Sequence, residues 1–137
     1  MSPYEHVDPA SQADPEKKSL FAILNERKDL TPCIGTEVLG VQLSQLSDIQ
    51  KDELALYVAE RGVVIFRKQN FVHQGAQWLK EYGSYFGRLH VHQWAVHVKD
   101  HPELDVVFRD SDSSYWSSTS AGTLNTTKWH SDMTYEL

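Results

Sequence analysis

The sequence predicts an α+β fold, because segments typical of strands and of helices follow one another along a short chain. Residues 37–43 place apolar side chains at 39, 41 and 43, which is the two-residue repeat of a half-buried strand. Residues 48–61 carry apolar side chains at helical spacing, and residues 63–66 are a continuous β-branched and aromatic run, typical of a strand buried on both faces. A helix that leads directly into such a strand indicates a mixed fold.

Residues 1–30 differ in composition from the rest of the chain and are expected to form a polar, largely irregular N-terminal arm. They are rich in proline, aspartate, glutamate and lysine, and only the apolar cluster at 20–24 can anchor them. The chain therefore divides into this arm, with at most one short helix, and a folded part at 31–137.

The helix expected at 48–61 has a recognisable start and stop. Ser47 is a preferred N-cap residue, and Asp48 and Asp52 place negative charge near the positive end of the helix dipole. Gly62 follows the last helical residue and supplies the C-terminal stop.

The second half of the chain is expected to hold one more helix and several strands. The helix covers 74–82, with Trp78 and Tyr82 on one side, and ends at Gly83 or Gly87. The remaining segments are predicted as a strand at 89–96 with His90 and His92 on one face, a strand at 104–109, a long polar loop at 110–127 and a strand-like segment at 128–137.

Composition and charge argue against two classes of function. Lysine and arginine number 13 against 19 aspartates and glutamates, for a net charge of -6, and basic residues nowhere cluster with aromatics, so no nucleic-acid partner is expected. No stretch approaches the length of a membrane span, and the N-terminus lacks the pattern of a signal peptide. With a lone Cys33, which fits a reducing compartment, these features predict a cytoplasmic protein with no membrane partner.

Seven histidines invite a search for metal ligands, and the simplest candidate is a histidine and an acid two residues apart on one face of a strand. Chance gives about one such pair. The chain holds three: His6 with Asp8, His101 with Glu103, and His130 with Asp132. The first lies in the polar arm, and the second encloses a proline, which disfavours a central strand. Both are interpreted as surface residues, whereas the third lies among apolar neighbours in a strand-like segment.

His130 and Asp132 can converge on one metal ion, because side chains at i and i+2 of a strand emerge about 6.6 Å apart. A neutral imidazole and a carboxylate are two of the three ligands in the facial triad of non-haem iron(II) oxygenases. The alternative is that the two side chains hydrogen-bond only to each other or to nearby backbone. His90 and His92 could also bind a metal, although no carboxylate follows at cupin spacing, or donate hydrogen bonds to an anionic substrate.

Residues 129–135 read Trp-His-Ser-Asp-Met-Thr-Tyr, which resembles the W-H-x-D-x-T-[FY] iron-binding segment of taurine dioxygenase-like enzymes. Residues 35–41, 61–67 and 86–92 resemble other segments of that family, in the same order. The resemblance covers residues 30–137, and residues 4–9 of the arm are similar to the fungal sulfonate dioxygenase branch.

The resemblance implies an iron(II)- and 2-oxoglutarate-dependent dioxygenase. His130 and Asp132 match the family's first two iron ligands, and His92 matches the histidine that contacts the substrate sulfonate. Such an enzyme takes a small anionic substrate, here one with an anionic group such as the sulfonate of taurine, together with dioxygen and with 2-oxoglutarate as co-substrate. It releases sulfite and an aldehyde. The implied fold is a double-stranded β-helix, which resembles a jelly roll.

Two further family residues, a distal histidine ligand and an arginine that pairs with 2-oxoglutarate, are expected outside these 137 residues. Residues 31–137 are therefore predicted to be the N-terminal portion of the domain: a partial double-stranded β-helix with N-terminal helices, its C-terminal half missing. Ala95 stands where the family has a substrate-contacting tyrosine, so a sulfate ester or a carboxylate is an alternative substrate. A non-catalytic remnant that associates through exposed strand edges, for example as a homo-oligomer, is the alternative from a different class.

Overall fold

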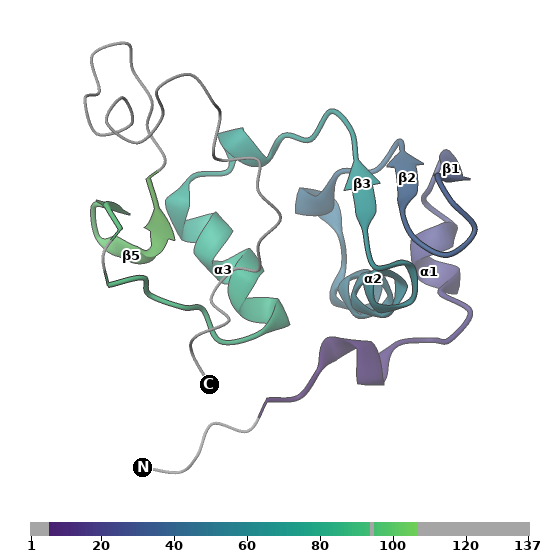
Figure 1. Cartoon of the computed structure of the whole chain (residues 1–137), viewed down its shortest axis with the longest axis horizontal. Coiled ribbons are helices and arrows are strands. Elements are labelled where there is room, and N and C mark those ends of the chain that lie inside the picture. Colours follow the sequence, from purple (N-terminus) through teal and green to yellow (C-terminus); the bar gives the residue numbers. More distant parts are fainter. Residues whose placement is uncertain (1–5, 94, 107–137) are drawn as a thin grey trace, which may run out of the picture. The chain divides into compact units, whose positions relative to one another are not determined.

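The computed structural model of the chain describes residues 6–93 and 95–106, which Figure 1 draws in colour. Their elements are, in order, η1 (Pro9–Gln12), α1 (Lys18–Phe21), β1 (Glu26–Asp29), β2 (Thr36–Leu39), η2 (Leu43–Gln45), α2 (Asp48–Arg61), β3 (Val64–Phe66), η3 (Phe71–His73), α3 (Ala76–Phe86), β4 (His97–Val98) and β5 (His101–Asp105). This mixture of helices and strands confirms the coarse α+β prediction. The double-stranded β-helix stays a prediction.

The helix α2 coincides with the predicted helix and has the predicted ends. The Ser47 hydroxyl accepts a hydrogen bond from the Gln50 backbone N–H at 3.4 Å, and the Gln50 side chain accepts one from the Ser47 backbone N–H at 2.9 Å. This capping box satisfies two amide groups that the first turn leaves without helical partners. At the other end Gly62 has a φ of 66°, a left-handed conformation that favours glycine.

Strands β1, β2 and β3 form one sheet in that order. β1 runs antiparallel to β2, with Glu26 opposite Leu39 and Asp29 opposite Thr36. β3 runs parallel to β2, with Thr36 opposite Val64. A parallel neighbour requires a crossover connection, which α2 supplies. Figure 1 shows α2 end-on beside these strands.

The predicted strand at 37–43 is wrong in its extent and in its buried face. β2 ends at Leu39, which is 37% exposed, and its buried side chains are Thr36 and Val38. Because side chains alternate along a strand, this register turns the even-numbered positions to the core, and not 39, 41 and 43.

The turn at Gly40 explains the error. Gly40 has a φ of 85°, and an added Cβ would lie 2.2 Å from the Asn25 side-chain nitrogen, so only glycine fits there. The strand repeat is broken at this turn, after which Val41 is again buried. Residues on either side of the turn therefore cannot be counted as one strand.

The strand at 63–66 was expected to be buried on both faces, and this prediction is wrong. β3 covers only Val64–Phe66, all three side chains are half-buried, and Val63 is 48% exposed. Within the described residues β3 is an edge strand with one neighbour, β2, so part of its surface has nothing to pack against.

The core lies between the sheet, α1 and α2. Leu20 is 1% exposed at its centre. The other buried apolar side chains are Val38, Val41, Leu46, Leu54 and Tyr57. Residues 9–29, assigned from sequence to the arm, thus contribute η1, α1 and β1, and α1 brings Leu20 into the core. The division of the chain into an arm at 1–30 and a domain at 31–137 stays a prediction.

A buried carboxylate fastens α1 to α2. Glu53 is 1% exposed, and its side chain accepts hydrogen bonds from the backbone N–H groups of Leu20 at 2.5 Å and Ser19 at 3.3 Å. These amides belong to the first turn of α1, where N–H groups lack helical acceptors. An ion pair of 2.8 Å between the Lys17 ammonium and Glu60 adds a second link.

The second half of the described chain departs further from the predictions. α3 ends before Gly87, the later of the two predicted stops. Of the strand expected at 104–109, residues 104 and 105 belong to β5, which begins at His101 and pairs with the two-residue strand β4, while residues 107–109 lie outside the described residues. The predicted loop at 110–127 and the segment at 128–137 lie outside the described residues.

Candidate functional site

The predicted iron ligands His130 and Asp132 lie outside the described residues. Within the described ranges, no group of three or more histidine, cysteine, aspartate or glutamate side chains could hold a metal ion. A metal site at His130 and Asp132 therefore stays a prediction. Their imidazole and carboxylate groups are donors that suit iron(II), so the fit rests on donor chemistry.

His92, the predicted sulfonate contact, lies in the segment that follows α3. The described residues between Gly87 and Ala95 form neither helix nor strand, so the predicted strand at 89–96 is wrong there. The rings of His90 and His92 are nevertheless neighbours, with centroids 6.2 Å apart and planes at 82°. An irregular segment, and not a strand face, brings the two imidazoles together.

A close contact holds this segment against α3. A Cβ added at Gly83, inside the helix, would lie 3.0 Å from the Leu89 side chain. Glycine costs a helix interior about 1 kcal/mol relative to alanine, but here it lets the chain pack closely after the helix ends. At Gly87, an added Cβ would lie 3.5 Å from the His6 ring, so the N-terminal residues also reach this segment.

An aromatic cluster fixes the apolar face of α3. The rings of Trp78 and Tyr82 stack with centroids 5.0 Å apart, and Phe71 of η3 meets both edge-on at 5.1 Å. Phe86 continues the row at 5.3 Å from Tyr82. Burial in this cluster raises the pKa of Tyr82 to about 12.

Tyr85 links α3 to α2. Its hydroxyl donates to the Asp52 carboxylate at 2.6 Å and lies 3.0 Å from the Asp48 carbonyl oxygen. The Lys51 ammonium lies 4.3 Å from the centre of the ring. Burial, followed by the hydrogen bond to Asp52, raises the pKa of Tyr85 well above its usual value.

A salt bridge links α3 to the β4–β5 hairpin. The Lys80 ammonium lies 2.5 Å from one oxygen of Glu103, and the hydrogen bond between them is the main cause that lowers the pKa of Glu103. The side chain of Glu103 is only 16% exposed, so its interpretation as a surface residue is wrong. Its second oxygen and Nδ1 of His101 are buried without hydrogen-bond partners in the described part of the chain.

A second pair of ionisable side chains, His97 and Asp105, lies across the β4–β5 hairpin. Nδ1 of His97 lies 3.2 Å from a carboxylate oxygen of Asp105, which stands opposite it in the strand register. The contact is within ion-pair distance but lacks hydrogen-bond geometry. It contributes attraction only when the imidazole is protonated.

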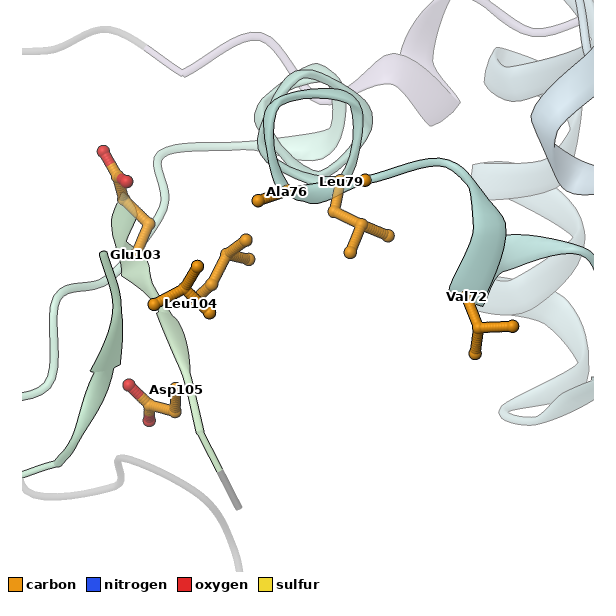
Figure 2. Close-up of a pocket in the computed structure, with 8 residues that line it drawn as sticks. Val72, Ala76, Leu79, Glu103, Leu104 and Asp105 are labelled. Atoms are coloured by element: carbon orange, nitrogen blue, oxygen red, sulfur yellow. The ribbon is translucent and has the colours of Figure 1, made fainter. Parts of the chain in front are cut away.

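Two surface pockets meet at Glu103. The first, about 490 Å³, lies between α3 and β5 and has mainly aliphatic walls, including Val72, Leu79 and Leu104. Figure 2 shows Leu79 pointing from α3 into this space, whereas the Glu103 carboxylate points away from Leu104. This pocket suits an apolar group.

The second pocket, about 350 Å³, lies beside the end of α3 and is here called the α3-end pocket. Its charged lining consists of Lys80, Arg88 and Glu103. Ser84, Gly87, Leu89 and Val91 complete it. The lining therefore combines cationic groups with an apolar wall, next to the segment that carries His92.

Comparison with known proteins identifies the ancestry of the chain. The sequence model of the taurine catabolism dioxygenase TauD, TfdA family matches residues 26–137. The chain belongs to this family. Within the TauD/TfdA family, the chain is 44% identical over 138 aligned residues to an alpha-ketoglutarate-dependent sulfonate dioxygenase of Saccharomyces cerevisiae, covering 98% of the chain.

Two further relatives of this TauD/TfdA-family chain come from Penicillium expansum. They are the alpha-ketoglutarate-dependent dioxygenases cnsM, 46% identical over 81% of the chain, and cnsP, 38% identical over 97% of the chain. The aligned regions cover 34%, 31% and 36% of the yeast, cnsM and cnsP proteins respectively. The chain thus spans about a third of the length of the relatives it matches.

The described helices of the TauD/TfdA-family chain are all too short or too polar to cross a membrane. The α3-end pocket and the Lys80–Glu103 pair were not foreseen from the sequence, because their residues are 23 positions apart and follow no local pattern. The one available signal was the alternation of His101, Glu103 and Asp105, which favours a strand with a polar face.

Proposed function

We propose that this chain supplies the N-terminal part of an iron(II)- and 2-oxoglutarate-dependent dioxygenase that oxidises a sulfonate such as taurine and releases sulfite and an aldehyde. The observation that carries the proposal is the family match over residues 26–137. It is supported by the similarity, over 98% of the chain, to a protein named as a sulfonate dioxygenase.

His130 and Asp132 are proposed as two ligands of the iron. When bound, iron(II) supplies the redox chemistry that couples decarboxylation of 2-oxoglutarate to oxidation of the substrate. A third histidine ligand and an arginine for the 2-oxoglutarate carboxylate are proposed to come from sequence outside these 137 residues. This assignment agrees with the share of about a third that the chain covers in its relatives.

His92 is proposed to bind the sulfonate. A sulfonate is an anion at neutral pH, and an imidazole N–H donates to it most strongly when the ring is protonated. Arg88 lines the pocket beside the same segment, which adds positive potential where an anion would bind.

The test is sulfite release by the intact protein with iron(II), 2-oxoglutarate and taurine, with succinate measured in parallel. His130→Ala is expected to abolish both products, and His92→Gln to raise KM for the sulfonate with a smaller change in kcat. His73→Ala is the matched control, because His73 is exposed at the end of η3 and outside the pockets described above. Absence of both products in the unmodified protein would overturn the proposal.

The second candidate keeps the reaction and changes the substrate to a sulfate ester or a carboxylate. It is favoured by Ala95, which stands at the position of the family's substrate-contacting tyrosine. The names of cnsM and cnsP also specify no sulfonate. A screen for succinate release over sulfonates, sulfate esters and aryloxy acids separates the two candidates, because only the first also releases sulfite from a sulfonate.

A further inference from the structure

The α3-end pocket has the composition of a site for a small amphiphilic ligand. Its volume of about 350 Å³ lies at the lower end of the range for small-molecule sites. Leu89 and Val91 supply an apolar wall, and Ser84 supplies a hydroxyl that can donate or accept. All of its lining residues are described by the structure.

The charges of this pocket do not cancel. Lys80 and Glu103 form a contact of 2.5 Å and neutralise each other. Arg88 is exposed and has no hydrogen bond or ion pair with another described residue. The lining therefore carries one uncompensated positive charge, on a guanidinium whose planar donors match the oxygens of a sulfonate or carboxylate.

The carboxylate of the pocket lining, Glu103, is already paired with Lys80. One oxygen of Glu103 is occupied by Lys80, and the other is buried from solvent. An ammonium group in the pocket would meet Lys80 and Arg88 without a free carboxylate. The charge pattern thus fits a monoanion and disfavours a zwitterion.

We propose that the α3-end pocket binds the anionic head group of an alkanesulfonate that lacks an ammonium group, with Arg88 as the residue that determines this specificity. The alkyl chain lies along Leu89 and Val91, and the Ser84 hydroxyl donates to the head group. The inference rests on the proposed function for the identity of the ligand, since a sulfonate is the substrate class of that reaction. It predicts that a simple alkanesulfonate binds better than taurine.

The experiment is a titration of the ¹⁵N-labelled chain, without iron or 2-oxoglutarate, with 1-propanesulfonate, taurine and propylammonium in turn. Propanesulfonate is expected to give saturable shifts of the Ser84, Arg88 and Val91 amides. Taurine should bind several-fold more weakly, and propylammonium should cause no saturable shift. Loss of a charge-assisted hydrogen bond in Arg88→Gln should weaken propanesulfonate binding roughly tenfold.

Two further variants sharpen the test. Lys99→Gln removes the same charge from the turn between β4 and β5, outside the pocket lining, and should leave binding unchanged. Glu103→Gln releases Lys80 from its ion pair and should tighten binding of propanesulfonate. The backbone spectrum of each variant shows whether it folds as the parent chain does.

The proposal is overturned if Arg88→Gln and Lys99→Gln bind propanesulfonate equally, or if taurine binds as tightly as propanesulfonate. Its failure differs from failure of the proposed function. Sulfite release by an intact Arg88→Gln protein with unchanged KM would remove this inference and keep the function. Arg88-dependent binding without any sulfite release would keep the site and remove the function.

Discussion

Two regions of the described chain differ sharply in burial. The first, residues 9–66, is called the N-terminal core here and contains every buried residue of the described ranges. The second, residues 71–93 and 95–106, is called the α3–hairpin region and contains none. Yet α3 is the more apolar helix, with a row of aromatic side chains, whereas α2 is mostly polar and buries Glu53, Leu54 and Tyr57.

The comparison shows that an apolar helix face is buried only where another layer covers it. α2 packs against the sheet and against η1 and α1, so even a carboxylate becomes buried there. α3 has the hairpin beside it within the described residues, and its aromatic rings stay half-exposed. The α3–hairpin region, which has the lower burial, carries the two pockets that meet at Glu103 and the His92 segment.

The largest expected difference in the free energy of unfolding is between alanine substitutions of two leucines, one in each region. Leu20→Ala should lower the free energy of unfolding by about 2–5 kcal/mol, because Leu20 is 1% exposed and its removal leaves a cavity. Leu79→Ala, on the half-exposed wall of the larger pocket, should cost about 1 kcal/mol. Urea unfolding of both variants measures the difference. Equal losses would refute the assignment of the core to residues 9–66.

The second largest loss of unfolding free energy is expected from a substitution of the buried carboxylate of the N-terminal core, Glu53. Glu53→Gln replaces an acceptor of two backbone N–H groups by an amide and should cost about 1–3 kcal/mol. Glu26→Gln, on the exposed strand β1, should change the free energy of unfolding by less than about 0.5 kcal/mol. Thermal unfolding of the pair gives the comparison, and a neutral Glu53→Gln variant would argue against its role in fastening α1.

The Tyr85–Asp52 hydrogen bond, which links the two regions, should contribute less to the free energy of unfolding. Tyr85→Phe removes the hydrogen bond to Asp52 and should cost about 0.5–1.5 kcal/mol. It should also speed hydrogen exchange of the α3 amides more than that of the α2 amides. Tyr82→Phe is the control, since no hydroxyl hydrogen bond of Tyr82 occurs among the described residues. A faster exchange confined to α2 would contradict this view of the link.

The smallest effect should be a pH dependence from the α3–hairpin region. The pKa of Glu103 is lowered below its usual 4.5 in the folded chain, first by the hydrogen bond from Lys80. The folded state therefore binds the proton less readily than the unfolded state, and the stabilisation is present above pH 4.5 and is lost as the pH falls through the lowered pKa. Glu103→Gln should remove this dependence, whereas Glu26→Gln should keep it. Urea midpoints measured between neutral and acid pH provide the check.

The parts of the fold that the sequence predicted correctly have local causes. The ends of α2 depend on Ser47 and Gly62, which act within one turn of the helix, and α3 ends directly before Gly87. The predictions are wrong where an alternating pattern continues through a turn or an irregular segment. The turn at Gly40 ends the alternation of β2, and the residues after Gly87 form an irregular segment although their pattern alternates.

The features of the candidate site likewise fall into those with a local cause and those that depend on contacts between distant residues. The motif at 129–135 and the family match could be read from the order of residues alone, because both depend on which side chains follow one another. The closeness of His90 and His92 was also predictable, although the predicted strand was not formed. The Lys80–Glu103 bridge and the α3-end pocket could not be predicted, since no local signal pairs residues 23 positions apart.

The sequence by itself determined the family of this chain, the α2 helix with both its caps, and the residue types available for an iron site and for an anion. The tertiary structure alone decided which side chains are buried, which face of β2 turns inward, and which charge in the α3-end pocket is left uncompensated. The physical reason is range: caps and motifs depend on neighbours within a few residues, whereas burial and charge pairing depend on contacts between distant segments.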